Sequence, residues 1–109
     1  MIKVKVMGQD WKVYLHTPEK FERKTDSSDA AFVLPELREA HFNSGDLTRE
    51  VVCHEVWHMW RAGLLTNSAR LDTDQEEEMS AELFACHADK MLRFARALYK
   101  ELKALDDEG

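Results

Sequence analysis

The sequence predicts one α+β domain over residues 1–109, with a small, mostly antiparallel β-sheet followed by two long helices. Two observations predict this class. The first residues, Met1-Ile2-Lys3-Val4-Lys5-Val6, alternate apolar and polar side chains as a half-buried strand does. After residue 46, apolar residues recur every three or four positions, as along one side of an α-helix.

Four short segments are predicted to be strands, at residues 2–7, 11–15, 30–34 and 38–42. The first two are joined by a predicted turn at Gly8-Gln9-Asp10. Thr17-Pro18-Glu19 predicts a short helix that continues to residue 24, followed by a polar loop over residues 25–29. The β-rich part of the chain therefore ends before residue 43.

The first long helix is predicted from about residue 47 to residue 62, with Asp46 as its N-cap and Gly63 as its C-terminal glycine. Its broad apolar surface suits a buried helix. Trp57 and Trp60 could form pocket walls, but on so apolar a helix we interpret them as core residues.

The second long helix follows a connecting loop and opens at Thr73-Asp74-Gln75-Glu76, which has the form of a capping box. Acidic residues fill its first turns and basic residues come later, as the helix dipole favours. Seven apolar residues form a heptad-like seam at Phe84, Ala88, Met91, Ala95, Leu98, Leu102 and Leu105. The seam predicts packing within the chain or, as the alternative, a homodimer contact through this C-terminal helix.

Composition and charge exclude several classes of function. The net charge of -6 argues against a nucleic-acid partner, because phosphate binding needs a basic face. The sequence has no apolar run long enough for a membrane span and no apolar signal core at its start. Cys53 and Cys86 are too few for a disulfide scaffold and are predicted to be buried free thiols. We therefore expect a cytoplasmic protein that acts on neither membranes nor nucleic acid.

The strongest functional signal is His54-Glu55-Val56-Trp57-His58, inside the first predicted long helix. Two histidines four residues apart share one helical face, so both imidazoles can bind the same zinc ion (Zn2+). Glu55 is then placed to act as the general base that deprotonates a zinc-bound water. The alternative is a helix with two unrelated histidines and a solvent-facing glutamate.

A catalytic zinc site needs a third protein ligand besides these histidines. One group of zinc peptidases takes a histidine six residues after the second motif histidine, with a glycine between. Leu64 and Arg61 occupy those two positions and exclude that group. Asp72 or Asp74 would have to reach the site from a flexible segment, and His87 is expected to point away from the acidic face of its helix.

The strongest candidates for the third ligand lie in Glu76-Glu77-Glu78-Met79-Ser80-Ala81-Glu82. Glu78 and Glu82 are four residues apart and share a helical face. One carboxylate could bind the metal while the other accepts a hydrogen bond from a ligating imidazole. Without a metal, the same cluster is an acidic N-terminal turn of a helix.

These motifs resemble a minimal gluzincin, one of the thermolysin-like zinc peptidases with a glutamate ligand on a helix after the His-Glu-x-x-His motif. Glu78 follows His58 by 78 − 58 = 20 residues, and Glu82 stands four further on, where the family has an acidic residue. The stretch Glu78-x-x-Ala81-x-x-Phe84-Ala85 is also similar to small phage and bacterial metallopeptidases of the ImmA/IrrE type. The resemblance covers roughly residues 30–90.

The resemblance implies a zincin-like fold and a zinc metallopeptidase that acts on a peptide or protein substrate. It implies that His54, His58 and Glu78 bind zinc, that Glu55 is the catalytic base, and that Glu82 supports a ligating histidine. The family usually has aspartate or asparagine at the position of Glu82. The division of roles between the two glutamates therefore stays open, with Glu78 preferred as the ligand.

Three hypotheses follow from the sequence. The first is a zinc-dependent endopeptidase that binds an extended peptide along a sheet edge, from residues 30–34 or 38–43. Larger relatives stabilise the oxyanion from a further domain, which we do not expect in 109 residues. Local substitutes would be Tyr99, His87 and Arg93. The second hypothesis is a zinc-binding regulatory or interaction module with the same fold and little chemistry. The third is a metal-free α+β interaction domain.

Overall fold

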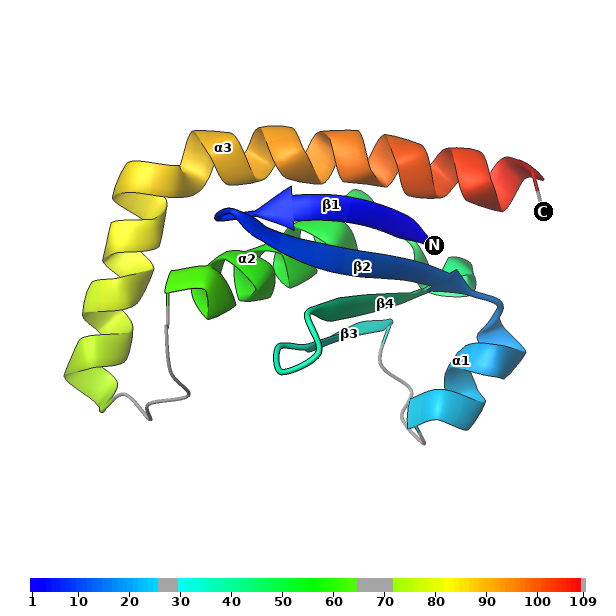
Figure 1. Cartoon of the computed structure of the whole chain (residues 1–109), viewed down its shortest axis with the longest axis horizontal. Coiled ribbons are helices and arrows are strands. Elements are labelled where there is room, and N and C mark those ends of the chain that lie inside the picture. The colour runs from blue at the N-terminus through cyan, green and yellow to red at the C-terminus, as the bar shows by residue number, and fades with distance from the viewer. Residues whose placement is uncertain (26–29, 65–71, 109) are drawn as a thin grey trace.

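The computed structural model describes residues 1–25, 30–64 and 72–108. A four-stranded sheet is followed by two helices that cover one of its faces, and a short helix lies at the other end of the sheet (Figure 1). The elements are β1 (Ile2–Val6), β2 (Gln9–His16), α1 (Pro18–Thr25), β3 (Ala31–Leu34), β4 (Glu39–Asn43), a 3-10 turn (Ser44–Asp46), α2 (Arg49–Leu64) and α3 (Thr73–Glu108). The α+β class predicted from the sequence is confirmed.

The sheet has the strand order β1-β2-β4-β3. β1 pairs antiparallel with β2, and β3 pairs antiparallel with β4, while β2 and β4 run parallel. Two of the three pairings are antiparallel, as the sequence predicts. The parallel pair is possible because the chain between β2 and β4 crosses over through α1 and β3. β3 lies at a sheet edge, and β4 is internal.

The turn between β1 and β2 contains Met7 and Gly8, because Val6 already pairs with Gln9. Met7 and Gly8 have φ angles of 52° and 77°, the positive values that a two-residue type I′ hairpin requires. The predicted turn at Gly8-Gln9-Asp10 is therefore wrong by one residue. Gln9 and Asp10 are exposed and polar, but their backbone belongs to β2.

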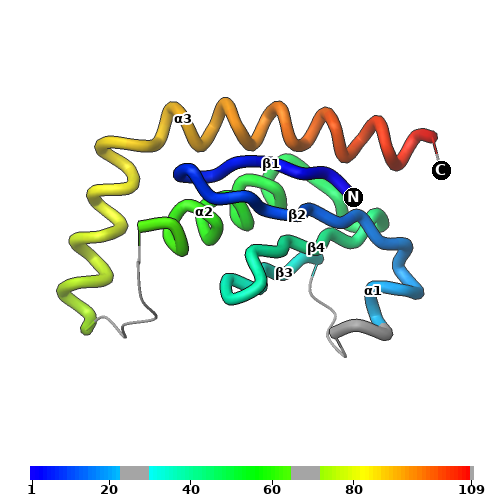
Figure 2. The backbone as a smooth tube through the Cα atoms, viewed as in Figure 1, coloured from blue at the N-terminus to red at the C-terminus, as the bar shows by residue number. Residues whose placement is uncertain are grey.

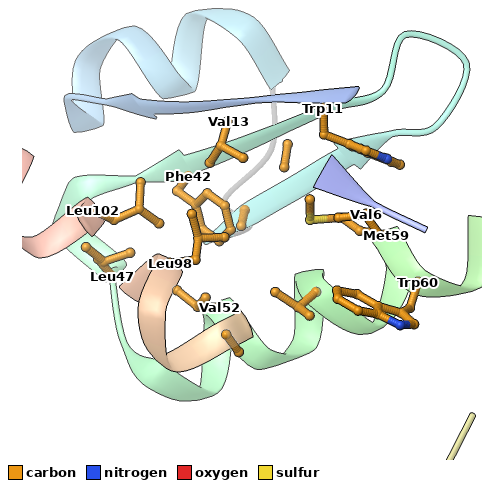
Figure 3. Packing of buried hydrophobic residues seen from close by; sticks show 14 of the residues in the cluster. Val6, Trp11, Val13, Phe42, Leu47, Val52, Met59, Trp60, Leu98 and Leu102 are labelled. Atoms are coloured by element: carbon orange, nitrogen blue, oxygen red, sulfur yellow. The ribbon is translucent and has the colours of Figure 1, made fainter. Parts of the chain in front are cut away.

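The core lies between the sheet and the two long helices. Val13 and Phe42 point from the central strands toward Leu98 and Leu102 of α3 (Figure 3). Alternate residues of a strand face opposite sides of a sheet, so one side of β2 and β4 faces α2 and α3 while the other faces α1. None of the helices in the described ranges combines the length and apolar character needed to cross a bilayer.

The start of α2 differs from the predicted one. The helix begins at Arg49, and the hydroxyl of Thr48 caps it by accepting a hydrogen bond from the Val51 backbone N–H at 3.2 Å. Asp46, the predicted cap, lies in the 3-10 turn instead, where its carboxylate accepts a hydrogen bond from the Asn43 side chain at 3.3 Å. The polar residues Asn43 to Asp46, from which the sequence predicts a helix cap, instead form the turn through which the chain leaves β4.

Gly63 lies inside α2 rather than after its end, which corrects the predicted C-terminal glycine. A Cβ added at Gly63 would lie 2.9 Å from the Cβ and Cγ atoms of Met7. The glycine is needed because the β1–β2 turn packs directly on the last turn of α2. The predicted loop after Leu64 lies mostly at residues 65–71, outside the described residues.

The capping box of α3 lies one residue earlier than predicted. Asp72 Oδ1 accepts a hydrogen bond from the Gln75 backbone N–H at 2.7 Å, and the Asp72 backbone N–H donates to Gln75 Oε1 at 3.0 Å. The helix itself spans 36 residues, which would be about 54 Å long if straight. The longest extent of the molecule is 42 Å, so α3 must bend, and Figure 2 shows it as two arms.

The predicted seam of α3 is partly used within the chain. Ala95, Leu98 and Leu102 are buried in the core, as predicted. Phe84, at the other end of the seam, is 78% exposed. The seam therefore packs on the body of the domain at Ala95, Leu98 and Leu102, whereas Phe84 at its N-terminal end faces solvent.

Candidate metal centre

His54 and His58 lie on the side of α2 that faces away from the core. Their Nε2 atoms are 3.2 Å apart. Two nitrogen ligands of a tetrahedral zinc ion, each bound at 2.0–2.1 Å, must lie about 3.3 Å from one another. The two imidazoles are therefore held at the separation that a shared zinc ion requires, as the one-turn spacing predicts.

The charge state of His58 also suits metal binding. The pKa of His58 is lowered, first by desolvation and then by the nearby His54 and the Arg61 guanidinium. A lowered pKa favours the neutral imidazole, and the neutral imidazole is the form that binds metals. At neutral pH, His58 is thus ready to ligate without first losing a proton.

Glu55 is only 7% exposed, at the border between the histidine face and the core. The alternative of a solvent-facing glutamate is wrong for this residue. Burying a carboxylate costs free energy, so an acidic residue at such a position usually serves a function. A side chain directly beside the first motif histidine is where the mechanism needs a general base.

Two further side chains border the histidine pair. The Trp57 ring lies edge-on to the His58 ring, with centroids 5.1 Å apart, and is half-buried. Arg61 lies one turn beyond His58, with its guanidinium 6.0 Å from the Trp57 ring centroid. Trp60 is buried in the core, as predicted, whereas Trp57 forms part of the rim of the site.

Arg61 also forms an ion pair with Glu76, which joins α2 to the first turns of α3. Sequence reasoning missed this contact and explained Glu76 by the helix dipole and solvent. The sequence offers one signal for this contact, because Arg61 follows His54 by seven residues and His58 by three and so lies on the same helical face. The contact shows that the acidic end of α3 lies beside the motif helix.

Glu78 and Glu82 do not meet the histidines in this structure, and both are exposed on α3. Because each helical residue turns by about 100°, Glu78 points roughly 200° away from Glu76, which faces α2. Within residues 1–25, 30–64 and 72–108, no three His, Cys, Asp or Glu side chains are grouped to hold a metal ion. The structure thus brings His54 and His58 together, and the binding of a metal by them and by a third ligand stays a prediction.

The weaker candidates for the third ligand have other positions. Asp72 serves as the N-cap of α3, and Asp74 is exposed in the first turn. His87 is half-buried, and its Nδ1 atom is buried without a hydrogen-bond partner. The geometry of the described residues therefore favours none of these three over Glu78.

The local substitutes for an oxyanion-stabilising group are partly engaged elsewhere. The Tyr99 ring lies 5.9 Å from the guanidinium of Arg49, the first residue of α2. Arg93 is exposed, and its Nε donates to the Asp89 carbonyl at 3.5 Å. Arg61, which was not among these candidates, is a cation close enough to His58 to help lower its pKa.

The two cysteines are free, and neither is fully buried. Cys53 is half-buried beside the motif, whereas Cys86 is exposed, so the prediction of buried thiols is wrong for Cys86. The Cys86 thiol donates a hydrogen bond to Glu82 Oε1 at 3.3 Å, and this carboxylate raises the pKa of the thiol. In this arrangement Glu82 supports a thiol of its own helix.

Comparisons with protein-family models, curated proteins and solved structures found no match for this chain. A function for this chain must therefore be inferred from its residues and their geometry. The main observations are the convergence of the His54 and His58 imidazoles and the burial of Glu55.

Proposed function

We propose that the protein is a zinc-dependent metallopeptidase in which His54, His58 and Glu78 bind zinc and Glu55 is the general base. The observation that carries the proposal is the 3.2 Å separation of the two Nε2 atoms, next to a carboxylate that is only 7% exposed. A merely structural zinc site needs no such carboxylate. A zincin-like description of the fold belongs to the same proposal.

The third ligand requires a change at the start of α3. The ion pair between Arg61 and Glu76 already holds this acidic turn beside α2. Glu78 is two residues from that contact but points away from it. A rotation or shift of the first turns of α3 would exchange Glu76 for Glu78 on the side that faces the histidines. Metal binding supplies the free energy for such a change, as it does in other sites that are completed by their metal.

In the proposed reaction, His54, His58 and Glu78 would hold the zinc ion, which would supply Lewis-acid chemistry when bound. Glu55 accepts the proton from the attacking water and delivers it to the leaving amine. Glu55 is buried and directly follows His54 on α2. The chain thus contributes two imidazoles and one proton carrier from a single turn of α2.

A peptide substrate would bind along β3. β3 is an edge strand, so one side of its backbone is open to another strand, and it contacts α2. An extended peptide can add to such an edge through main-chain hydrogen bonds. β4, the other strand considered from the sequence, lies between β2 and β3 and offers no edge.

The test begins with metal content, measured by mass spectrometry on untagged protein, and cleavage of a peptide library. We expect about one zinc per chain and cleavage in the wild type. A Glu55→Gln variant should retain zinc and lose cleavage by at least about a hundredfold. Glu50→Gln is the matched control, because Glu50 is an exposed acid on the same helix. Full cleavage by Glu55→Gln would refute the assigned base.

The third ligand is tested separately with Glu78→Ala, Glu82→Ala and Glu77→Ala. Loss of zinc affinity in Glu78→Ala alone supports the proposed ligand set. Loss in Glu82→Ala alone would exchange the roles of the two glutamates. Equal affinity in all three variants would show that the third ligand comes from another residue.

A second candidate function is a zinc-binding regulatory or protein-interaction module with little peptidase activity. The observation that favours it is Phe84, which is 78% exposed on α3 and is the apolar side chain that a partner on this helix would cover. Association through α3 would make a homodimer, which sedimentation of wild type and Phe84→Ser distinguishes. Zinc binding without cleavage favours this module. Absence of zinc after reconstitution favours the metal-free interaction domain.

A further inference from the structure

The guanidinium of Arg61 holds a carboxylate of its own chain beside the motif histidines. Arg61 Nη2 donates a hydrogen bond to Glu76 Oε1, and the ion pair joins α2 to the first turns of α3. Arg61 follows His58 by 61 − 58 = 3 residues on α2, and its charge helps to lower the pKa of His58. A carboxylate is therefore already docked at the rim of the proposed zinc site.

The ring of Trp57 supports this guanidinium. Arg61 Cζ lies over the Trp57 ring, 6.0 Å from its centroid, and the same ring is edge-on to His58 at 5.1 Å. An aromatic face orients a guanidinium and leaves its N–H groups available to a planar acceptor such as a carboxylate. Trp57 and Arg61 together thus form a carboxylate-binding corner next to His58.

The ion pair is open to solvent, so its carboxylate can be exchanged for another. The side chains of Arg61 and Glu76 are 27% and 40% exposed. Ion pairs exposed to this extent contribute little to stability, because water solvates both charges when they separate. In the proposed zinc-bound form, the movement of the first turns of α3 also turns Glu76 away from the histidine side. Both features make Arg61 available to a carboxylate from outside the chain.

Arg61 and Glu55 lie on opposite sides of His58. Each is three residues from His58, one before it and one after it, so they are turned by about 60° around the helix in opposite senses. Along the helix axis, Arg61 lies about 4.5 Å beyond His58. An extended peptide rises about 3.3 Å per residue, so an acidic group that reaches Arg61 belongs one or two residues from the bond held over the histidines.

We propose that Arg61 determines substrate specificity by binding a substrate carboxylate in the place that Glu76 fills in this structure. This inference rests on the proposed peptidase function. The substrate class is a peptide with a carboxylate one or two residues from the cleaved bond, supplied by an acidic side chain or by a free C-terminus. Glu76 is then an internal competitor that occupies Arg61 until such a substrate binds.

The surrounding charges make this single cation decisive for an acidic substrate. The first turns of α3 carry exposed acids at Asp74, Glu77 and Glu78, and the whole chain has a net charge of -6. Such surroundings repel an acidic peptide unless a cation binds it directly. A preference for acidic peptides must therefore depend on Arg61, and added salt should weaken it, because the guanidinium is partly exposed.

The binding test follows the Arg61 Nε–H and Trp57 indole N–H signals by NMR in the zinc-free full chain, so that no peptide carboxylate can bind a metal. The probes are blocked alanine peptides with one central glutamate or glutamine. We expect the glutamate peptide to shift both signals and the glutamine peptide to shift neither at the same concentration. Glu76→Gln should bind the glutamate peptide about threefold more tightly, because the internal competitor is removed. Glu77→Gln is the matched control and should bind it as wild type does.

The cleavage test uses zinc-loaded chain and a library peptide with glutamate or glutamine at each of the two positions on either side of the cleaved bond. Both peptides of a pair compete in one reaction, so the ratio of their kcat/KM values does not depend on the amount of active enzyme. At one of these positions, wild type should prefer glutamate by about fivefold, and Arg61→Met should reduce the ratio to about one. Arg49→Met, at the start of α2, should keep the wild-type ratio. A glutamine peptide with a free C-terminal carboxylate identifies the C-terminus as the source if it is preferred over its blocked form.

The two tests separate failure of this inference from failure of the peptidase. Cleavage without a preference for a carboxylate, or a preference that survives in Arg61→Met, would overturn the inference and leave the peptidase in place. Absence of any cleavage, with both NMR signals shifted by the glutamate peptide, would refute the peptidase and support Arg61 as a carboxylate-binding residue. Unshifted signals in both wild type and Glu76→Gln would overturn the inference whatever the peptidase result.

Discussion

This protein has two pairs of histidines in which the two side chains of each pair lie close together. The surroundings of the two pairs differ. His54 and His58 lie on an outer face of α2, with Nε2 atoms 3.2 Å apart, and their side chains are partly or fully exposed. His16 and His41 lie 2.8 Å apart at the opposite face of the sheet, enclosed by aromatic rings. The Glu39 carboxylate is hydrogen-bonded to Nε2, the second ring nitrogen of His41.

The ring centroids of the two pairs are almost equally far apart, 4.9 Å for His54 and His58 and 5.0 Å for His16 and His41, so the surroundings distinguish the pairs. At 2.8 Å, a ring nitrogen of His16 or His41 donates a hydrogen bond to the other ring. The Glu39 carboxylate on the other side of His41 fixes the tautomer. At 3.2 Å, beside solvent, two lone pairs can converge on a metal ion. His16 and His41 are joined with Glu39 by hydrogen bonds, whereas we propose that His54 and His58 bind zinc.

The largest expected difference between the pairs is in zinc affinity. His54→Ala should weaken zinc binding by more than about a hundredfold, because loss of a ligand exceeds the effect of losing an outer hydrogen-bond partner. His16→Ala should leave the affinity unchanged. Competition with a chromogenic chelator measures both constants. A parallel loss of affinity in His16→Ala would mean that the two pairs do not have separate roles.

The free energy of unfolding should show the opposite dependence, with a larger loss for a change at His41 than for one at His54. His41→Ala removes a buried ring from an aromatic stack and leaves Glu39 without its donor, which should cost about 3 kcal/mol in the free energy of unfolding. His54→Ala, on an exposed position, should change the apo-protein by no more than about 0.5 kcal/mol. Urea unfolding followed by circular dichroism gives both values. Similar losses in the two variants would contradict the contrast in burial.

A smaller change tests the carboxylate behind His41. Glu39→Gln keeps a hydrogen-bond acceptor but removes the charge, so unfolding should become easier by about 1 kcal/mol near neutral pH. Zinc affinity should not change. Glu36→Gln, an exposed acid in the neighbouring turn, serves as the control in the same urea titration. A Glu39→Gln protein as stable as the control would show that the charge is unimportant there.

The smallest expected effect concerns the pH dependence of zinc binding. Arg61 is the last of three causes that lower the pKa of His58, after desolvation and His54. Its removal in Arg61→Met should raise this pKa, so that His58 is protonated at a higher pH and zinc dissociates earlier on acidification. Arg49→Met is the control at the other end of α2. Zinc titrations over a pH series test the direction, and a shift toward lower pH would contradict the assignment.

The same linkage applies to the stability of the apo-protein. Because the folded-state pKa of His58 is lowered, the unfolded chain binds more protons in the acidic range. The contribution of His58 to stability is therefore fully present above the unfolded-state value of about 6.5 and is lost as the pH falls through its lowered folded-state pKa.

The type and order of the elements were predictable because strands and helices have local periods. The boundaries were less so, since they depend on contacts with other segments. Thr48 caps α2 because Asp46 is engaged with Asn43, and Gly63 lies within the helix because Met7 packs against it. The sequence pattern around each end of α2 does not indicate that Asn43 engages Asp46 or that Met7 packs against Gly63.

The sequence by itself determined the convergence of His54 and His58, because residues four apart in a helix meet in any fold that keeps the helix. Tertiary structure decided the burial of Glu55 and the contact of Arg61 with Glu76. It also decided the contact between His16 and His41, which are 25 residues apart and meet only because β2 and β4 pair in parallel register. Helical spacing is a property of neighbours, whereas strand order is set by how the whole chain buries its apolar faces.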